Sequence, residues 1–163
     1  MELQHAKLIQ AMIEYDKGDA MRIQHFMKVH DFATAIGKLE GIDNDVLFIL
    51  ETAAIVHDIG IHISEEKYGS CIGKYQEMEG PAEADKLLHK VGGYTEKQID
   101  RVKFLIAHHH TYKDISGMDY QILVEADFLV NIYEDRLSKE SVNHVREKIF
   151  KTSAGKDFLD NIF

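Results

Sequence analysis

The chain has 163 residues, of which 45% are hydrophobic and 29% are charged, and its formal net charge is −9. This composition is that of an ordinary globular domain, which argues against a disordered chain or a coiled coil. The negative charge argues against broad nucleic-acid binding, which depends on Lys and Arg side chains that neutralise phosphates, but it leaves a small anionic substrate open.

Apolar residues recur at helical spacing along most of the chain, and no stretch shows the alternation of a strand. Between residues 59 and 80 the pattern loosens and predicts loops with short helical pieces. The predicted helices span, in chain order, residues 3–17, 20–39, 45–57, 81–90, 95–109 and 118–136, then a helix from Ser138 or Ser141 and a last one from Ser153 to near Phe163.

Local sequence supplies starting signals for three of these helices. Asp19 is placed to cap the second helix, and Thr95 with Gln98 forms a capping box. Pro81 is placed as the first residue of its helix, where the missing N–H has no intrahelical partner to lose. The sequence therefore predicts an all-α, single-domain helical bundle over residues 1–163.

The cysteine and histidine counts indicate the compartment and the type of metal ligand. A single cysteine, Cys71, excludes an intramolecular disulfide and a thiolate metal cluster. No segment approaches 18 consecutive apolar residues, and the N-terminus does not resemble a signal peptide, so we expect a cytoplasmic protein with no membrane partner. Ten histidines indicate imidazole as the ligand of any bound metal.

The direction of each polar side chain follows from the 100° between successive residues of a helix. His25 lies at the centre of the apolar stripe of its helix, whereas His30, about 140° away, is predicted to face outward. His57 and Asp127 share the apolar faces of their helices, and His109 is the best aligned of three consecutive histidines. Four helices therefore direct a His or Asp inward, where an unpaired charge is costly.

These inward groups have a structural and a functional interpretation. One inward histidine is more often a hydrogen-bonded core residue than a metal ligand. Four such groups each need a partner, and one divalent cation would satisfy them together, because imidazole and carboxylate suit Mn, Fe, Co, Ni or Zn. The remaining histidines predicted at the surface are His5, His30, His89 and His144.

The ordered set consists of His25, the pair His57-Asp58, the run His108-His109-His110, and Asp127. It resembles the HD-domain superfamily of metal-dependent phosphohydrolases, in which the order is His, His-Asp, optional histidines, then Asp. The resemblance covers roughly residues 20–135. It implies an HD-type helical bundle with this motif core at about residues 20–135 and C-terminal helices, residues 138–163, packing on it.

The resemblance also implies roles for individual residues. His25, His57, Asp58 and Asp127 match the four metal ligands of the family. Asp58 bridges two ions in dinuclear members, and we expect it to be catalytic as well. His108 and His109 fall where members place histidines that bind a second metal, phosphate or the nucleophilic water, so both are predicted to be catalytic.

Three basic residues are candidates for binding substrate phosphate. Arg22, one turn before His25, offers a fork-like guanidinium, and Lys74 and Lys103 are weaker candidates.

The chain departs from the family pattern in one region. Dinuclear phosphodiesterase members usually have another histidine after the His-Asp pair, but residues 75–81 contain none, and Glu77 or Glu79 would have to replace it. We therefore expect one divalent ion rather than two, with Mn, Fe, Co, Ni, Zn and Mg as candidates. The Gly-Tyr-Pro signature of cyclic-di-GMP phosphodiesterases is absent after the histidine run, which argues against that substrate.

The predicted function is hydrolysis, by metal-activated water, of a phosphomonoester or phosphoanhydride in a nucleotide-like small molecule. The alternative is a non-catalytic module that contains the metal and binds or senses a nucleotide. The expected partner is a small phosphorylated substrate, with no extended nucleic acid and no membrane. The sequence is compatible with a homo-oligomer.

Overall fold

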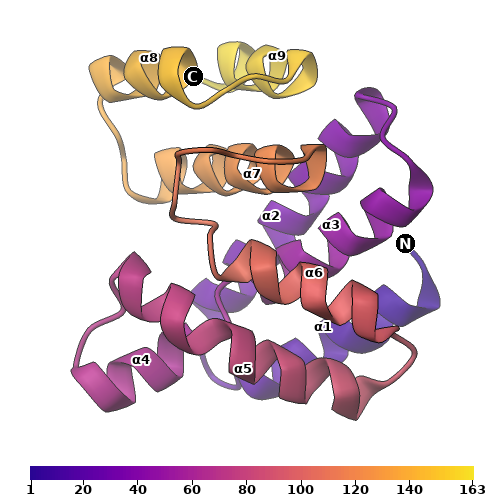
Figure 1. Ribbon diagram of the computed structural model, residues 1–163. Helices are drawn as coiled ribbons and strands as arrows, with labels where there is room; N and C mark the ends of the chain where they lie inside the picture. The colour runs from indigo at the N-terminus through magenta and orange to yellow at the C-terminus, as the bar shows by residue number, and fades with distance from the viewer.

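The computed structural model describes residues 1–163, and every regular element in it is a helix, which confirms the all-α prediction. Figure 1 shows the helices α1 (Leu3–Tyr15), α2 (Ala20–Leu39), α3 (Asn44–Val56), α4 (Ile61–Tyr68), α5 (Gly73–Val91), α6 (Glu96–Ile106), α7 (Met118–Glu134), α8 (Lys139–Lys148) and α9 (Ser153–Ile162).

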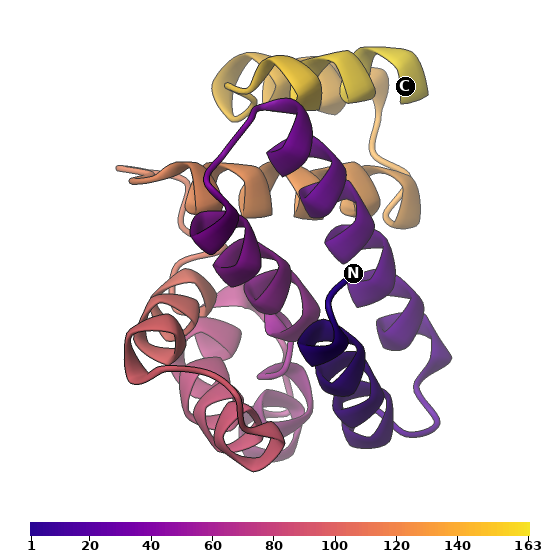
Figure 2. The ribbon, with the colours of Figure 1, turned by 90° about the vertical axis from the view of Figure 1, so that its right-hand side faces the viewer.

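Helix α3 lies at the centre of the bundle and packs against α1, α2, α6 and α7. Its residues from 50 to 56 are all buried, so its sequence is apolar on nearly every side. Figures 1 and 2 show α8 and α9 on one side of α7, and α1, α4 and α5 at the opposite end of the molecule. The turn that follows α3 therefore lies between these two ends.

The stretch Asn44–Tyr68 is long and apolar enough, by composition alone, to cross a membrane. In the fold it is divided by a turn into α3 and α4, and 67% of its most apolar window is buried inside the molecule. The core of the bundle thus accounts for its apolar character.

A close approach between two glycines fixes the turn after α3. A Cβ atom on Gly60 would lie 2.8 Å from the backbone nitrogen of Gly80 and 2.8 Å from the carbonyl oxygen of Gln76. Because any side chain at Gly60 would collide with backbone, only glycine lets this turn rest on α5. The contact holds the chain immediately after Asp58.

Two predicted helix boundaries are wrong. The helix predicted to begin at Pro81 begins at Gly73, and Pro81 lies inside α5, where it removes the N–H that would bond the carbonyl of Glu77. Packing of α5 against α4 and α6 outweighs this local cost. Helix α6 ends at Ile106, so the three consecutive histidines lie in a turn rather than in a helix.

The predicted caps are present. The Asp19 side chain accepts a hydrogen bond from the backbone N–H of Arg22, and Thr95 and Gln98 form the capping box of α6. These helix starts are local events, because a capping side chain bonds backbone groups within three residues of itself.

A buried glutamate joins the C-terminal helices to α7. Glu125 is fully buried, and its Oε1 accepts from the backbone N–H groups of Lys151 at 2.7 Å and Thr152 at 3.0 Å. Its Oε2 accepts from the Thr152 hydroxyl, which in turn caps α9. Helices α8 and α9 are therefore anchored to the helix that contains Asp127.

Two histidines predicted at the surface, His5 and His30, are buried, with 0% and 2% of their surface exposed. His30 Nε2 lies 3.4 Å from Glu51 Oε1, and His5 Nδ1 lies 3.7 Å from Glu51 Oε2. The prediction failed for His30 because α2 packs against both α7 and α3, and for His5 because α1 packs against both α3 and α5. His89 and His144 are exposed, as predicted.

We expect Glu51→Ala to lower the free energy of unfolding by about 3 kcal/mol, because it leaves two buried imidazoles without the carboxylate they face. Urea denaturation of the chelator-treated protein measures the change. Glu66→Ala, at an exposed position of α4, is the control and should change the value by less than about 0.5 kcal/mol. Equal stability of the two variants would show that the His5–Glu51–His30 cluster is not a stabilising contact.

Candidate metal centre

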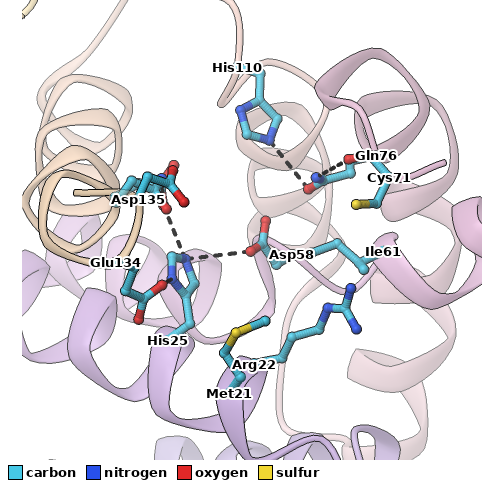
Figure 3. Close-up of a pocket in the computed structure, with 12 residues that line it drawn as sticks. Met21, Arg22, His25, Asp58, Ile61, Cys71, Gln76, His110, Glu134 and Asp135 are labelled. Atoms are coloured by element: carbon cyan, nitrogen blue, oxygen red, sulfur yellow. Dashed lines mark hydrogen bonds and ion pairs between the residues drawn. The ribbon is translucent and has the colours of Figure 1, made fainter. Parts of the chain in front are cut away.

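Five polar side chains from four segments of the chain meet beside the central helix. They are His25 on α2, His57 and Asp58 in the turn after α3, His109 in the turn after α6, and Asp127 on α7. Four of them are buried, with exposed fractions of 7% or less. Asp58 is half-buried and faces a pocket (Figure 3).

The distances between donor atoms suit a single cation. His25 Nε2 lies 3.2 Å from both His57 Nε2 and Asp127 Oδ1, and 3.5 Å from Asp58 Oδ2. His57 Nε2 lies 3.5 Å from Asp58 Oδ2 and 3.6 Å from Asp127 Oδ1. Ligands about 2.1 Å from an ion are roughly 3.0–3.5 Å from one another in octahedral or tetrahedral coordination. The four residues predicted as metal ligands therefore lie together at ligand spacing.

The hydrogen bonds of the imidazoles show which ring nitrogen is free. In each of three histidines Nδ1 faces an atom that can only accept, so Nδ1 has a proton, and in the neutral ring Nε2 has the lone pair. The pairs are His25 with Glu134 Oε2 at 2.8 Å, His57 with the Ala54 carbonyl at 2.8 Å, and His109 with the Ile106 carbonyl at 2.7 Å.

With these tautomers, the hydrogen-bond acceptors of the centre, imidazole Nε2 atoms and carboxylate oxygens, face one another. The Nε2 lone pairs of His25 and His57 face each other and the carboxylates, and the buried Nε2 of His109 has no hydrogen-bond partner. Such an arrangement is repulsive unless positive charge lies among the atoms. Imidazole nitrogen with carboxylate oxygen is a donor set that divalent first-row ions accept, so the residues fit a metal.

The pKa values of His25 and Asp127 are shifted by the same close contacts between imidazoles and carboxylates. Burial lowers the pKa of His25, but the hydrogen bond to Asp127 and the charge of Asp58 raise it more, to about 9. Burial raises the pKa of Asp127, but the imidazoles of His25 and His57 hold it well below its usual range. The centre thus attracts positive charge strongly, and a proton on His25 competes with a metal for the same lone pair.

The two oxygens of Asp58 face different histidines. Oδ2 faces His25 and His57, whereas Oδ1 lies 3.5 Å from His109 Nε2. A second group of donors, Asp58, His109 and His110, has ligand atoms within 4.8 Å of one another. Asp58 could therefore contribute to two sites, and the expectation of a single ion stays a prediction.

The structure brings His110, rather than His108, to this second group. The His108 ring stacks on Phe104 with 4.2 Å between ring centroids, and its Nδ1 donates to the Phe104 carbonyl at 2.7 Å. Helical periodicity ranked His109 first, in agreement with its position, but it misplaced His108 and His110 because residues 107–110 form a turn in which the 100° rule does not hold. His108 is predicted to be catalytic, but its ring lies against Phe104 rather than beside Asp58.

A pocket of about 340 Å³ opens beside the metal-ligand residues and is lined by residues from α2, α4, α5 and α7 (Figure 3). Arg22 lies on its wall, as expected for a residue that binds phosphate. Its guanidinium is engaged by Asp19 Oδ2 at 2.5 Å and by Glu65 Oε1 at 2.7 Å. Arg22 is the one Lys or Arg side chain that lines the pocket.

The two lysine candidates are not brought to the pocket. Lys74 is exposed and does not line it, and Lys103 forms an ion pair with Asp85, 2.8 Å between Nζ and Oδ1. Neither residue is among those that line the pocket with Asp58. Their predicted role in substrate binding is therefore not supported by their positions.

Neither glutamate replaces the histidine missing from residues 75–81. Glu77 accepts hydrogen bonds from the His110 backbone N–H and the Thr111 hydroxyl, both at 3.0 Å. Glu79 accepts from Lys67 and from a tyrosine hydroxyl at the surface. The residue of this segment that lines the pocket is Gln76, which the sequence analysis did not single out.

Two polar residues on α7 orient the ligands, although the sequence assigned them no role. Asn131 Nδ2 donates to Asp127 Oδ1 at 2.9 Å, and Glu134 bridges His25 and Lys28, whose Nζ lies 2.6 Å from Glu134 Oε1. Asn131 and Glu134 follow Asp127 by four and seven residues, so helical spacing places both on the same face of α7 as Asp127.

No family model and no curated protein matches the chain. A search of solved structures finds the crystal structure of a predicted HD superfamily hydrolase from an uncultured Thermotogales bacterium. That structure is similar with a TM-score of 0.68 and 22% sequence identity, over 96% of this chain and 83% of the other. The chain therefore has the HD-type fold that the sequence resemblance implied.

We expect the protein stripped of metal by a chelator to lose stability as the pH rises from 6.5 to 9. The pKa of His25 is raised from 6.5 to about 9 in the folded state, so its proton stabilises the fold fully below pH 6.5, and this is lost as the pH passes 9. With saturating Mn²⁺ the trend should reverse, because deprotonated ligands bind the ion better.

Urea denaturation at pH 6.5, 8 and 9, with chelator and with Mn²⁺, measures both trends. His25→Gln removes the titrating group and should flatten the profile of the chelator-treated protein. A chelator-treated wild-type protein that gains stability over this range would contradict the predicted protonation of His25.

Proposed function

We propose that this protein is a metal-dependent phosphohydrolase of the HD-domain superfamily. The observation that supports the proposal is the buried centre in which imidazole lone pairs and carboxylates face one another beside an open pocket. The fold shared with a predicted HD superfamily hydrolase supports a hydrolase in general. The reaction and the substrate class are inferences from the site's chemistry.

His25, His57, Asp58 and Asp127 would hold the cation. A divalent ion in such a site lowers the pKa of water and neutralises a phosphoryl oxygen, which removes the repulsion between two anions. The chain's own contribution is rigidity: Glu134, Asn131 and two backbone carbonyls fix the orientation of the ligand side chains.

Asp58 and His109 are the residues we propose for proton transfer. His109 Nε2 lies 3.5 Å from Asp58 Oδ1, and it has no other partner. Burial lowers the pKa of His109, but the carboxylate of Asp58 raises it more, so the net shift is upward. His109 Nε2 can therefore accept a proton from the attacking water, and Asp58 stabilises the resulting imidazolium.

Arg22 is the residue we propose for binding the phosphate. Its guanidinium lies on the pocket wall and shares its hydrogen bonds with Glu65, whose side chain is 43% exposed. A phosphate could replace this exposed carboxylate and keep the fork-like geometry. Arg22 would thus bind the substrate without leaving an unpaired buried charge.

We propose that the substrate is a phosphomonoester or phosphoanhydride in a nucleotide-like small molecule. The pocket volume of about 340 Å³ suits the phosphate end of such a molecule. No Phe, Tyr or Trp lines the pocket, so a base would have no ring to stack on inside it. The base would therefore lie at or beyond the pocket mouth, with only the phosphate end enclosed.

We expect Asp58→Ala to lose its bound metal and to lower phosphate release by more than about 100-fold, because it removes a ligand shared by both donor groups. Elemental analysis of tag-free protein and phosphate release from a nucleotide panel with Mn²⁺, Co²⁺ or Mg²⁺ measure both effects. Glu66→Ala is the matched acidic control and should retain both.

The outcomes separate the candidate functions. An Asp58→Ala variant with full metal content would show that the metal is held elsewhere. A wild-type protein that binds metal and a nucleotide but releases no phosphate would instead identify a binding module without turnover.

A further inference from the structure

Two carboxylates from different parts of the chain hold the guanidinium of Arg22. Arg22 lies in the first turn of α2, and Figure 3 shows it on the same side of the pocket as Ile61, the first residue of α4. Asp19 immediately precedes α2, and Glu65 lies on α4. The one Lys or Arg side chain of the pocket wall is therefore surrounded by more negative charge than it neutralises.

Asp19 holds Arg22 through both of its oxygens. Its Oδ1 accepts from the Arg22 backbone N–H at 3.2 Å and thereby caps α2, and its Oδ2 accepts from Arg22 Nη1 at 2.5 Å. The Asp19 side chain is 21% exposed. Because one side chain bonds both the backbone and the guanidinium of the same residue, this contact is part of the start of the helix.

Glu65 holds the guanidinium through one oxygen only. Its Oε1 accepts from Arg22 Nη2 at 2.7 Å, and its Oε2 accepts no hydrogen bond and lies 4.0 Å from His62 Nδ1. The Glu65 side chain is 43% exposed, and an ion pair at such a position contributes little to stability. Of the two carboxylates, Glu65 is therefore the one that an incoming anion can displace.

Helix α4 has other contacts that keep it in place without the Glu65 ion pair. Ile61 is buried, and the Nζ atom of Lys67 lies 2.7 Å from Glu79 Oε2 on α5. The helix also packs along α5. The Glu65 side chain can therefore leave the guanidinium while the backbone of α4 keeps its position.

The edge of the guanidinium that faces Glu65 has an unused donor. Nη2 and Nε lie on the same edge of the Arg22 plane, and a phosphate can accept from both N–H groups at once. Glu65 accepts from Nη2 alone, and Nε makes no hydrogen bond. A phosphate with two oxygens on this edge would replace one hydrogen bond by two.

We propose that Glu65 occupies the place of the substrate phosphate on Arg22 and thereby limits how tightly the phosphate binds, whereas Asp19 is a positioning residue that keeps the guanidinium on the pocket wall. The inference rests on the proposed function, because it takes Arg22 as the residue that binds phosphate. The two carboxylates then act in opposite directions: removal of Glu65 favours phosphate binding, and removal of the Asp19 contact weakens it.

Calorimetric titration of the Mn²⁺-loaded protein with inorganic phosphate tests the role of Glu65. Glu65→Gln keeps the size of the side chain and removes its charge, so inorganic phosphate should bind about fivefold more tightly in a buffer of low ionic strength. Glu66→Gln, at an exposed position of the same helix, removes the same charge and should stay within about twofold of the wild type. In an Arg22→Met background Glu65→Gln should have no effect, because the carboxylate acts through Arg22.

Asp19→Asn separates the positioning of Arg22 from the capping of α2. Asn caps a helix about as well as Asp, but its amide nitrogen cannot accept a hydrogen bond from Arg22 Nη1. The loss of a negative charge would by itself favour an anion. Phosphate binding that is about fivefold weaker would therefore come from a guanidinium that is no longer held, and circular dichroism should show unchanged helix content.

The results separate this inference from the proposed function. A Glu65→Gln variant that binds phosphate no more tightly than Glu66→Gln would overturn the role of Glu65, and an Asp19→Asn variant that binds it at least as tightly as the wild type would overturn the role of Asp19. Either result leaves the proposed function intact where the wild type releases phosphate from the nucleotide panel. A wild-type protein that neither binds nor releases phosphate would overturn the proposed function itself.

Discussion

Hydrogen-bond acceptors of four side chains face one another in the interior of the bundle. Nitrogen lone pairs of His25 and His57 lie 3.2 Å apart, within 3.6 Å of the carboxylates of Asp58 and Asp127. An uncompensated polar cluster of this kind costs several kcal/mol inside a protein. Positive charge at the centre, from a bound cation or from the proton that the raised pKa of His25 favours, would remove this repulsion and let the helices that supply these groups pack together.

Helix ends give the ligands their orientation. The last carbonyl groups of a helix have no intrahelical partner. His57 follows α3 and His109 follows α6, and each donates its Nδ1 proton to the carbonyl three residues earlier, at Ala54 and Ile106. One hydrogen bond therefore completes the helix end and turns the Nε2 lone pair toward the centre. The same hydrogen bond at two helix ends orients two imidazoles toward Asp58.

None of the predicted metal ligands lies on α5, but this helix supports two segments beside the pocket: the turn after Asp58 and the turn that contains His110. Gly60 lets the turn after Asp58 rest on the helix beside Gly80, and Gly73 lets the His110 ring rest on the helix backbone. Gln76 and Glu77 between them bind the ring and the backbone of His110. Local sequence rules mispredicted the start of this helix because of Pro81. A proline is expected to begin a helix rather than to lie within one.

By itself the sequence determined the all-α class, the caps at Asp19 and Thr95 and the inward direction of His25, His57 and Asp127, because periodicity and capping act within a single helix. The positions of the other site residues depend on how the helices pack. Packing buried His30 against Glu51 and brought His110 rather than His108 to Asp58. These outcomes depend on which helices pack against a given face and on the path of a turn, and helical periodicity contains no information about either.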